Sequence, residues 1–255
     1  VVADEGNNRI QVLRYSDGQH LRTIGQQGAG NVQFSNPRGV ALDGAGHLVV
    51  VEYGNHRVQV LNYGDGSHVR TIGSSGSGNG QFNSPSGVAI DGDGNIVVHD
   101  GYGNGRIQVL RLSDGAHMRS IGSKGSGPGQ LSGHGGVAFD AEGNLVVADG
   151  SNHRIQVLRY SDGQHLRTIG EGGSDNGQFA YPQGVAFDGA GHLIVVEQGN
   201  HHAGHAGFGL TAQTQQVDVV HRKNGPLHFG NNRFFVTMNA LKNRDYQVQI
   251  SDIEA

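Results

Sequence analysis

The repeat that decides the fold is clearest at residues 136–159, which read GVAFDAEGNLVVADGSNHRIQVLR. The run Arg-Ile/Val-Gln-Val-Leu from this stretch recurs at intervals of 48, 49 and 48 residues, beginning at Arg9, Arg57, Arg106 and Arg154. The run Gly-Val-Ala recurs at the same intervals, beginning at Gly39, Gly87, Gly136 and Gly184. A fixed period of this length is the sequence signature of a repeat architecture.

Each repeat contains four short apolar runs of strand length, and no segment shows a helical period. In the fourth repeat the runs are Gly136–Asp140, Asn144–Asp149, Arg154–Tyr160 and His165–Ile169. Asp-Gly pairs lie between runs, and this pair is typical of type I′ hairpin turns, in which both central residues have positive φ. Four antiparallel strands in a repeat of roughly 45 residues are typical of one β-propeller blade. The sequence therefore predicts an all-β fold, a β-propeller of four-stranded antiparallel blades.

The recurring stretch resembles the NHL repeat, which is named for an Asn-His-Leu signature, and the resemblance covers about residues 1–202. It implies a propeller with the Gly-Val-Ala strand innermost, in a family whose members are usually six-bladed. The resemblance further implies a protein- or RNA-binding module. One branch, the peptidyl-hydroxyglycine amidating lyases, is enzymatic, and for that branch the resemblance implies a central metal held by histidines from different blades.

The repeats predict propeller units over residues 1–202, followed by a divergent β-rich tail at 203–255. The units are a partial first blade at 1–37, blades at 38–85, 86–134 and 135–182, and the start of a fifth at 183–202. The first unit lacks its innermost strand, and the fifth leaves the pattern after His202, which stands in the arginine position. The length of the tail permits it to close a ring of about five blades. A six-bladed ring and a separate small β module are the alternatives.

An unclosed ring would leave a blade edge with unpaired backbone groups, which invites pairing with another chain. Self-assembly through such an edge is therefore a further prediction. The composition excludes other classes: with 45 glycines among 255 residues there is no Gly-X-Y period, and there is no cysteine for a disulfide or a thiolate site. No apolar run reaches the length of a membrane span. The net charge of −4 disfavours a broad surface for nucleic acid.

The turns between the second and third strands are the first candidate binding surface. Loops on a rigid scaffold commonly carry binding residues, and these turns share one face with the long Gly-Ser linkers. The turn residues also vary from blade to blade, as a local site requires. The candidate binding residues on this loop face are His56, His153, His201, Tyr53 and Tyr102. The acid–arginine pairs that recur in every repeat, such as Asp149 and Arg154, are expected to be structural instead.

Two weaker candidate sites involve the end of the chain. The densest imidazole cluster, a candidate metal site, is His201, His202 and His205. The tail is the most basic region, and its candidate residues for RNA or an acidic partner are Arg222, Lys223, Arg233, Phe234 and Phe235. Recognition of RNA requires a basic face with aromatic side chains on which bases stack.

The repeats supply turns and core but no unique set of acid, base and nucleophile. We therefore expect a non-catalytic binding scaffold that presents loops to a protein or peptide partner, with no cofactor. A metal-dependent lyase or hydrolase resembling the amidating lyases is the first alternative, and the absence of histidine from the inner strands counts against it. Binding of RNA or an acidic polymer through the tail is the second alternative.

Overall fold

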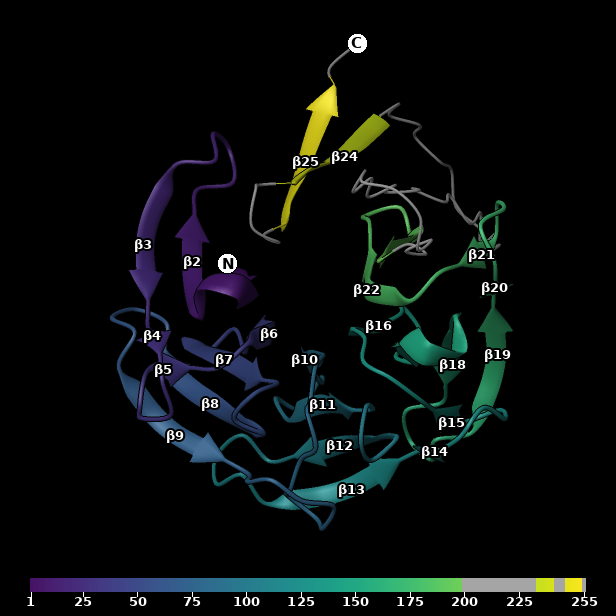
Figure 1. The fold of residues 1–255 in the computed structure, drawn as a ribbon, viewed down its shortest axis with the longest axis horizontal. Helices are drawn as coiled ribbons and strands as arrows, with labels where there is room; N and C mark the ends of the chain where they lie inside the picture. The colour runs from purple at the N-terminus through teal and green to yellow at the C-terminus, as the bar shows by residue number, and fades with distance from the viewer. Residues whose placement is uncertain (199–232, 241–245, 254–255) are drawn as a thin grey trace, which may run out of the picture.

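The computed structural model describes residues 1–198 and the backbone of residues 233–240 and 246–253. The first 198 residues form five consecutive antiparallel sheets, which Figure 1 shows as an arc around a common centre. The fold is all-β, as predicted, with two short 3-10 turns at Glu5–Asn7 and Gly150–Asn152. None of the helices in these described ranges is long and apolar enough to cross a membrane.

Three of the sheets are complete four-stranded blades with strands in chain order from the centre outward. The second blade consists of β6 (Pro37–Leu42), β7 (His47–Glu52), β8 (Arg57–Asn62) and β9 (His68–Ile72). The third consists of β10 (Val88–Ile90), β11 (Ile96–Asp100), β12 (Arg106–Leu110) and β13 (His117–Ile121). The fourth consists of β16 (Val137–Phe139), β17 (Leu145–Asp149), β18 (Arg154–Leu158) and β19 (His165–Ile169). The Gly-Val-Ala strand is innermost in each of them.

The first and fifth units are partial in the described part of the chain. The first contains β1 (Val2–Asp4), β2 (Arg9–Leu13) and β3 (His20–Ile24), and the register Asp4↔Arg9 shows that β1 is the equivalent of β7. The fifth contains β22 (Pro182–Phe187) and β23 (Leu193–Glu197). Among the strands of residues 1–198, β1 pairs with β2 alone, so the first sheet has three strands. β6 and β22 begin at Pro37 and Pro182, one residue before the predicted blade boundaries.

Short linkers connect the blades, and in each linker the beginning and the end pair with each other in parallel. The parallel pairs are β4 (Gln26–Gln27) with β5 (Gln33–Phe34), β14 (Ser123–Lys124) with β15 (Gln130–Leu131), and β20 (Glu171–Gly172) with β21 (Gln178–Phe179). The remaining linker makes the single bridge Ser75↔Phe82. In the tail, β24 (Arg233–Ala240) and β25 (Tyr246–Ile253) form an antiparallel hairpin that pairs with no other described strand.

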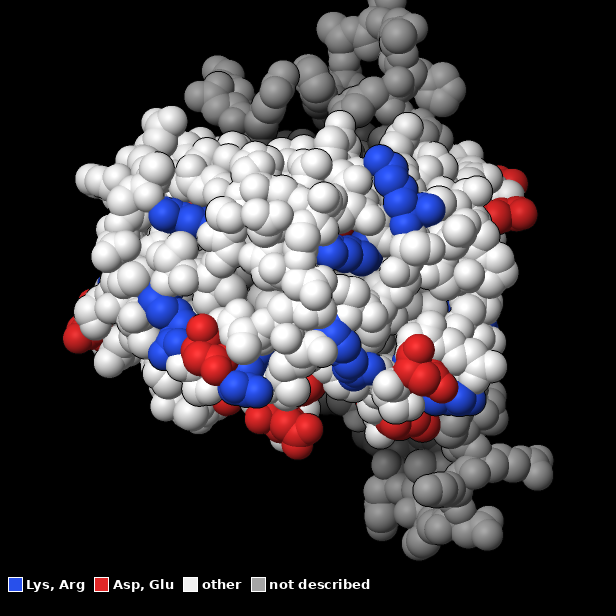
Figure 2. Space-filling view, turned by 90° about the horizontal axis from the view of Figure 1, so that it is seen from below, with Lys and Arg blue, Asp and Glu red and all other residues white. Residues whose placement is uncertain are grey.

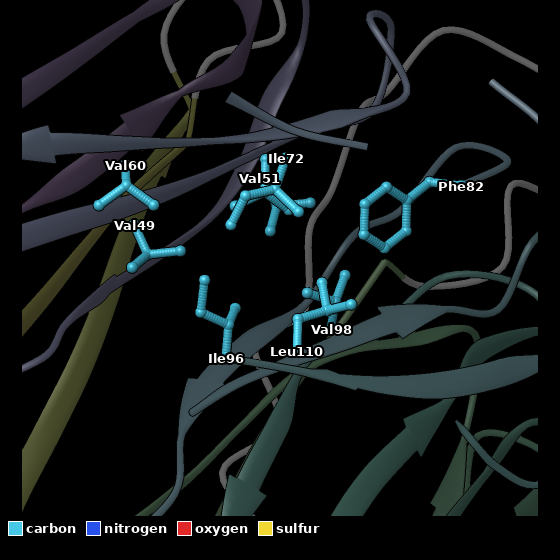
Figure 3. Close-up of a cluster of buried hydrophobic side chains, with 9 residues drawn as sticks. Val49, Val51, Val60, Ile72, Phe82, Ile96, Val98 and Leu110 are labelled. Carbon is cyan, nitrogen blue, oxygen red and sulfur yellow. The ribbon is translucent and has the colours of Figure 1, made fainter. Parts of the chain in front are cut away.

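The hydrophobic core consists of separate clusters between adjacent blades. Figure 3 shows the cluster between the second and third blades, where Val49 and Val51 of β7 face Ile96 and Val98 of β11. Leu48 and Val50 point to the other side of β7 and join the cluster shared with the first blade. A strand buried on both faces needs a continuous apolar run, because successive side chains alternate between the faces. This explains why the second strands read Leu-Val-Val-Val rather than alternating apolar and polar.

Buried carboxylates hold the linkers against the blades. The fully buried Glu52 accepts hydrogen bonds from Arg57 Nε at 2.6 Å, Gln59 Nε2 at 2.8 Å and the backbone N–H of Ser35 at 3.0 Å. The guanidinium of Arg57 also donates to linker carbonyls, including that of Gly30 at 2.8 Å. The third and fourth blades repeat this set of contacts around Asp100 and Asp149. The prediction that these acid–arginine pairs are structural is confirmed.

The prediction of type I′ hairpins is wrong for the Asp-Gly turns. In the Asp-Gly turns between third and fourth strands, glycine has positive φ, as at Gly18 (70°) and Gly66 (77°), but the aspartate before it does not. The backbone N–H of Gly18 donates to the carbonyl of Arg14, and the register shifts by one residue between Val12 and Leu13. The turns are therefore longer loops closed by one left-handed glycine. The aspartate instead accepts a backbone N–H two residues on, as at Gln19.

Candidate functional site

Two of the predicted tyrosines meet at the centre of the arc. Tyr53 directly follows β7, and Tyr102 lies in the turn that follows β11, which is one residue longer than its counterparts. Their ring centroids are 6.1 Å apart, with the rings at 64° to each other. Because the second strands of all blades end on the same side of the ring, these side chains lie at the mouth of the central channel on the loop face.

His134 completes an aromatic group with the two tyrosines. It precedes β16 by three residues, and its ring lies 6.2 Å from that of Tyr53 and 6.0 Å from that of Tyr102. Tyr102 is 53% exposed, whereas His134 is half-buried. We call Tyr53, Tyr102 and His134 the aromatic group. It presents aromatic edges and one accessible phenol to whatever enters the channel.

Arg38 provides the positive charge beside the aromatic group. Its guanidinium carbon lies 3.8 Å from the centroid of the Tyr53 ring, which is a cation–π contact. Its Nε donates to Glu5 Oε1 at 2.9 Å, so the first and second blades are joined at the channel mouth. Its Nη1 is buried and has no hydrogen-bond partner among the described residues. The guanidinium is therefore fixed in place with one donor unused.

A cavity of about 680 Å³ extends along the channel below this group. Its wall is formed by the inner strands, with Arg38, His134, Gln183 and Glu197 among the polar side chains that line it. The inner strands approach closely: a Cβ on Gly87 would lie 2.5 Å from the carbonyl oxygen of Gly135. Glycine at this position is therefore required by the narrow centre of the ring.

Two buried imidazoles adjoin the cavity. His99, on β11, is fully buried, and its Nδ1 lies 2.9 Å from the carbonyl oxygen of Gly135, while its Nε2 has no partner among the described residues. Burial lowers the pKa of His99, and burial, Arg38 and His99 together lower the pKa of His134 to about 4. Both imidazoles are therefore neutral at pH 7. The Nδ1 of His134 is also buried without a described partner, so it can accept or donate according to tautomer.

The two described turn histidines have backbone partners. His56 and His153 have left-handed φ values of 52° and 56°, which place each Nδ1 beside the end of the following linker. Each Nδ1 accepts a backbone N–H, from Ser84 at 2.9 Å and from Tyr181 at 3.2 Å respectively. Asn8 makes the equivalent contact in the first blade. These imidazoles hold the linkers in place, and their contact with a partner stays a prediction.

The remaining predicted site residues lie at the end of the fifth unit and in the tail. His201, His202, His205, Arg222 and Lys223 lie outside the described residues. Arg233, Phe234 and Phe235 lie in β24, of which only the backbone is described. The metal and RNA predictions that depend on these side chains therefore stay predictions.

The sequence reasoning missed the residues that surround the two tyrosines, namely Glu5, Arg38, His99 and His134. A signal was present, because each of these residues breaks the repeat at its position. His134 stands where the other blades have Pro37, Pro85 and Pro182, and His99 stands where the fourth blade has Ala148. A position-by-position comparison of the repeats finds them, whereas counting histidines on the inner strands does not.

The metal predicted by the amidating-lyase alternative does not fit the described residues. His99 and His134 come from adjacent blades, as that chemistry would require. Yet no three His, Asp or Glu side chains in residues 1–198 converge on a position that could hold a metal ion. A catalytic zinc site uses three protein ligands.

An all-β arc of four-stranded antiparallel sheets around a central channel defines the β-propeller class. The sequence model of the NHL repeat matches residues 34–61, 82–110 and 135–158. The chain therefore carries NHL repeats at three places, consistent with an NHL-repeat β-propeller family, and the resemblance noted from the sequence is confirmed. No curated protein matches the sequence.

Solved structures with the same fold include proteins of different kinds. One is a protein of unknown function from Bacteroides thetaiotaomicron (TM-score 0.59, 21% identity, covering 76% of this chain and 52% of that one). Another is a nidogen/laminin complex (TM-score 0.56, 22% identity, 74% and 64% covered). A third is a catalytically inactive virginiamycin B lyase from Staphylococcus aureus with quinupristin (TM-score 0.53, 16% identity, 75% and 57% covered). The chain thus spans about half to two thirds of the length of these proteins, and the likeness concerns the fold.

Proposed function

We propose that this protein is a non-catalytic binding propeller that takes a protein or peptide segment at the mouth of its central channel. The observation that carries the proposal is the Arg38 guanidinium, which Glu5 and Tyr53 hold at the cavity beside Tyr102 and His134. Tyrosine and arginine are enriched among the residues that dominate binding energy at protein interfaces. The similar nidogen/laminin structure is itself a complex between proteins, which supports this class of partner.

The site favours a segment with a hydrogen-bond acceptor, such as a carboxylate or a carbonyl, next to a flat apolar group. The acceptor would approach the exposed part of the Arg38 guanidinium, and the flat group would pack against Tyr102. A guanidinium that is already oriented by Glu5 and Tyr53 loses little freedom when it binds, which favours affinity.

The test is to select random twelve-residue peptides against the native protein and to measure the affinity of the enriched peptides for variants. Arg38→Met and Tyr102→Ser should each lower the affinity at least tenfold in calorimetry. Tyr15→Ser is the matched control, because Tyr15 is 77% exposed and lies in a hairpin of the first blade on the opposite face. Equal affinity for the native protein and both channel variants would contradict the proposal.

A second candidate function, a lyase or hydrolase, is favoured by one observation. His134 lies at the cavity and is neutral at pH 7, so one of its ring nitrogens has a lone pair that can accept a proton. Lyases are also among the solved structures with this fold. Incubation with an N-acyl-α-hydroxyglycine, with and without added zinc, would show this activity as release of glyoxylate that His134→Gln abolishes. Release that persists in this variant would rule out the base assigned here.

A further inference from the structure

A second site emerges where neighbouring blades touch on the side of the Asp-Gly hairpins. An arginine on the fourth strand of the first and third blades reaches to a tyrosine of the next blade. The guanidinium carbon of Arg22 lies 5.0 Å from the centroid of the Tyr63 ring, and that of Arg119 lies 4.2 Å from the Tyr160 ring. Each arginine also donates to the carbonyl of its tyrosine. The contact is thus a repeated device for joining blades.

The phenol ring of Tyr160 is held at this position by three kinds of contact. Its hydroxyl donates to Asp91 Oδ2 at 2.7 Å, and its ring meets Phe139 edge-on at 4.9 Å between centroids. Burial and the Asp91 carboxylate both raise the pKa of Tyr160, so the hydroxyl stays protonated and remains a donor. Guanidinium, carboxylate and apolar wall together bind one phenol ring within the chain.

Between the second and third blades the same position lacks the phenol. Leu112 occupies the tyrosine position, Arg70 occupies the arginine position, and Asp43 occupies the position of Asp91. Arg70 has no hydrogen bond or ion pair with any residue of the described ranges, in contrast to Arg22 and Arg119. A cavity of about 370 Å³ lies at this junction. It is lined by Asp43, His47, Val60, Arg70, Asn95 and Leu112, among others.

Asp43 is prepared to accept a further hydrogen bond. Its side chain is only 3% exposed, and its Oδ2 takes His47 Nδ1 at 2.6 Å. Asp91 Oδ2 accepts both Asn95 Nδ2 and the Tyr160 hydroxyl, which shows that the same oxygen can serve two donors in this geometry. The cavity therefore combines a buried acceptor, the Arg70 guanidinium and the apolar side chains of Val60 and Leu112. The guanidinium makes no hydrogen bond with the described residues and interacts through its charge with the exposed Asp114.

We propose that this cavity binds a phenol ring supplied by a tyrosine side chain of a protein partner. The incoming hydroxyl donates to Asp43, and the ring lies against Arg70 as the Tyr160 ring lies against Arg119. At the other two junctions the phenol ring comes from this chain, as Tyr63 or Tyr160. At the junction between the second and third blades it would come from the partner. This site is separate from the channel mouth and does not depend on the function proposed above.

The test is a titration of the isotope-labelled protein with p-cresol, the analogue of the tyrosine side chain, followed by amide chemical shifts. We expect saturable shifts confined to residues around Gly94 and Leu112, with an affinity on the order of millimolar for a ligand of this size. Toluene, which lacks the hydroxyl, should bind at least fivefold more weakly. N-acetyl-tyrosinamide should bind at the same place. Binding of p-cresol without binding of this amide would overturn the assignment to a protein side chain.

Leu112→Tyr and Tyr160→Leu are the matched variants. Leu112→Tyr supplies the missing ring internally and should abolish the shifts, whereas Tyr160→Leu opens a second cavity and should add a second set around Arg119. Asp43→Asn provides an independent reading if Tyr160→Leu does not fold, because loss of the charged acceptor should weaken p-cresol at least threefold. Unchanged p-cresol binding in Leu112→Tyr, or shifts that do not saturate, would overturn the proposal.

Discussion

At the scale of single residues, the buried carboxylates carry the stability of each blade. Asp149 is fully buried and accepts hydrogen bonds from Arg154 Nε, Gln156 Nε2 and the backbone N–H of Ser132 at 2.8, 2.9 and 2.8 Å. Its removal leaves a guanidinium, an amide and a backbone N–H without their acceptor. Surface carboxylates such as Asp162 make an exposed ion pair and accept one backbone N–H of their own turn instead.

Asp149→Ala should therefore destabilise the protein strongly, by roughly 3–5 kcal/mol, because one partner of a buried pair is lost. The measurement is the free energy of unfolding from urea denaturation. Asp162→Ala is the matched control and should destabilise the protein far less, since its ion pair with Arg159 is half exposed on both sides and is screened by solvent. Similar losses for the two variants would contradict the structural role of the network.

His134 makes the stability of the protein depend on pH in a defined window. Its pKa in the folded state is about 4, below the ordinary value of 6.5, so the unfolded chain binds the proton first as the pH falls. The stability contributed by the neutral imidazole is thus present above pH 6.5 and is lost between 6.5 and about 4. His134→Asn should shrink the drop in urea midpoint between pH 7.5 and 5.

The control for this prediction is His165→Asn, which removes an imidazole from the outer strand β19, away from the channel. It should leave the drop in midpoint unchanged. The ring protons of His134 should also show no titration above pH 5 in NMR spectra. A midpoint titration of His134 near 6.5 would contradict its neutral, buried state.

At the candidate site, the sequence could indicate individual residues but not which of them meet, and their role in binding stays a prediction. Tyr53 and Tyr102 were chosen as variable turn residues, and the structure brings them together. Arg38 and His134 were missed because they lie at or just before the start of an inner strand, outside the variable turns that were searched. Their contact with the tyrosines depends on the curvature of the ring, which sets blades side by side and which no single repeat encodes.

At the scale of elements, the linkers are as constrained as the strands. Each linker ends in a large apolar residue that packs beneath a glycine at its start, as Phe82 does beneath Gly73. A Cβ on Gly73 would lie 2.4 Å from Phe82 Cε2, and the φ of 88° is itself costly for other residues. Gly80 in the same linker also has positive φ, 72°, but open space around it.

These two glycines give a prediction with an internal control. Gly80→Ala should cost about 1 kcal/mol, the strain of the left-handed backbone alone. Gly73→Ala should cost roughly a further 1–3 kcal/mol, because the added methyl displaces Phe82 from the core. The difference between their urea midpoints measures the packing contribution. Equal costs would mean that Phe82 moves aside freely.

The turns show where element-level prediction fails. Asp-Gly correctly marked a reversal between strands, but the length of the loop was misjudged because Tyr-Ser before it reads as strand. The structure closes the loop with the N–H of Gly18 donating to Arg14 and with a bulge in the paired strand. Only the cross-strand register separates this loop from a two-residue turn, and register depends on the partner strand.

At the scale of the whole molecule, the period alone was sufficient to predict the architecture of residues 1–198. It could not predict how the ring ends, because the tail does not follow the repeat. β1 lacks a neighbour on its inner side among the described strands, and β23 lacks one on its outer side. On the rim seen in Figure 2, acidic and basic side chains are interspersed along the lower margin, so the described chain has no continuous basic patch on that side.

The proposal that the tail completes the ring predicts a pattern of hydrogen exchange. If residues 203–255 supply the missing inner strand of the first blade, the amides of Val2–Asp4 should be protected in the full chain. They should exchange at least tenfold faster when the tail is deleted, while amides of β11 and β12 stay protected. Protection that depends on protein concentration would instead indicate that a second chain fills the edge. Exchange of Val2–Asp4 that is fast in both proteins at every concentration would contradict both versions.

The reach of Arg57, Arg106 and Arg154 into the preceding linkers has a consequence for how the chain folds as it is synthesised. The carbonyls of Gly30, Gly78 and Gly127 accept a backbone N–H within their own linker, but their guanidinium donors lie on the third strand of the next blade. Each guanidinium follows its linker carbonyl by 27 or 28 residues in the sequence. The ribosome must therefore release that many residues before these hydrogen bonds to the linker can form. The last contacts of a linker thus form only after the third strand of the next blade has been synthesised. Until then the linker lacks its guanidinium donor. Addition proceeds in one direction, and a synonymous slow codon run placed just after a third strand would fall where pausing lets the finished contact form.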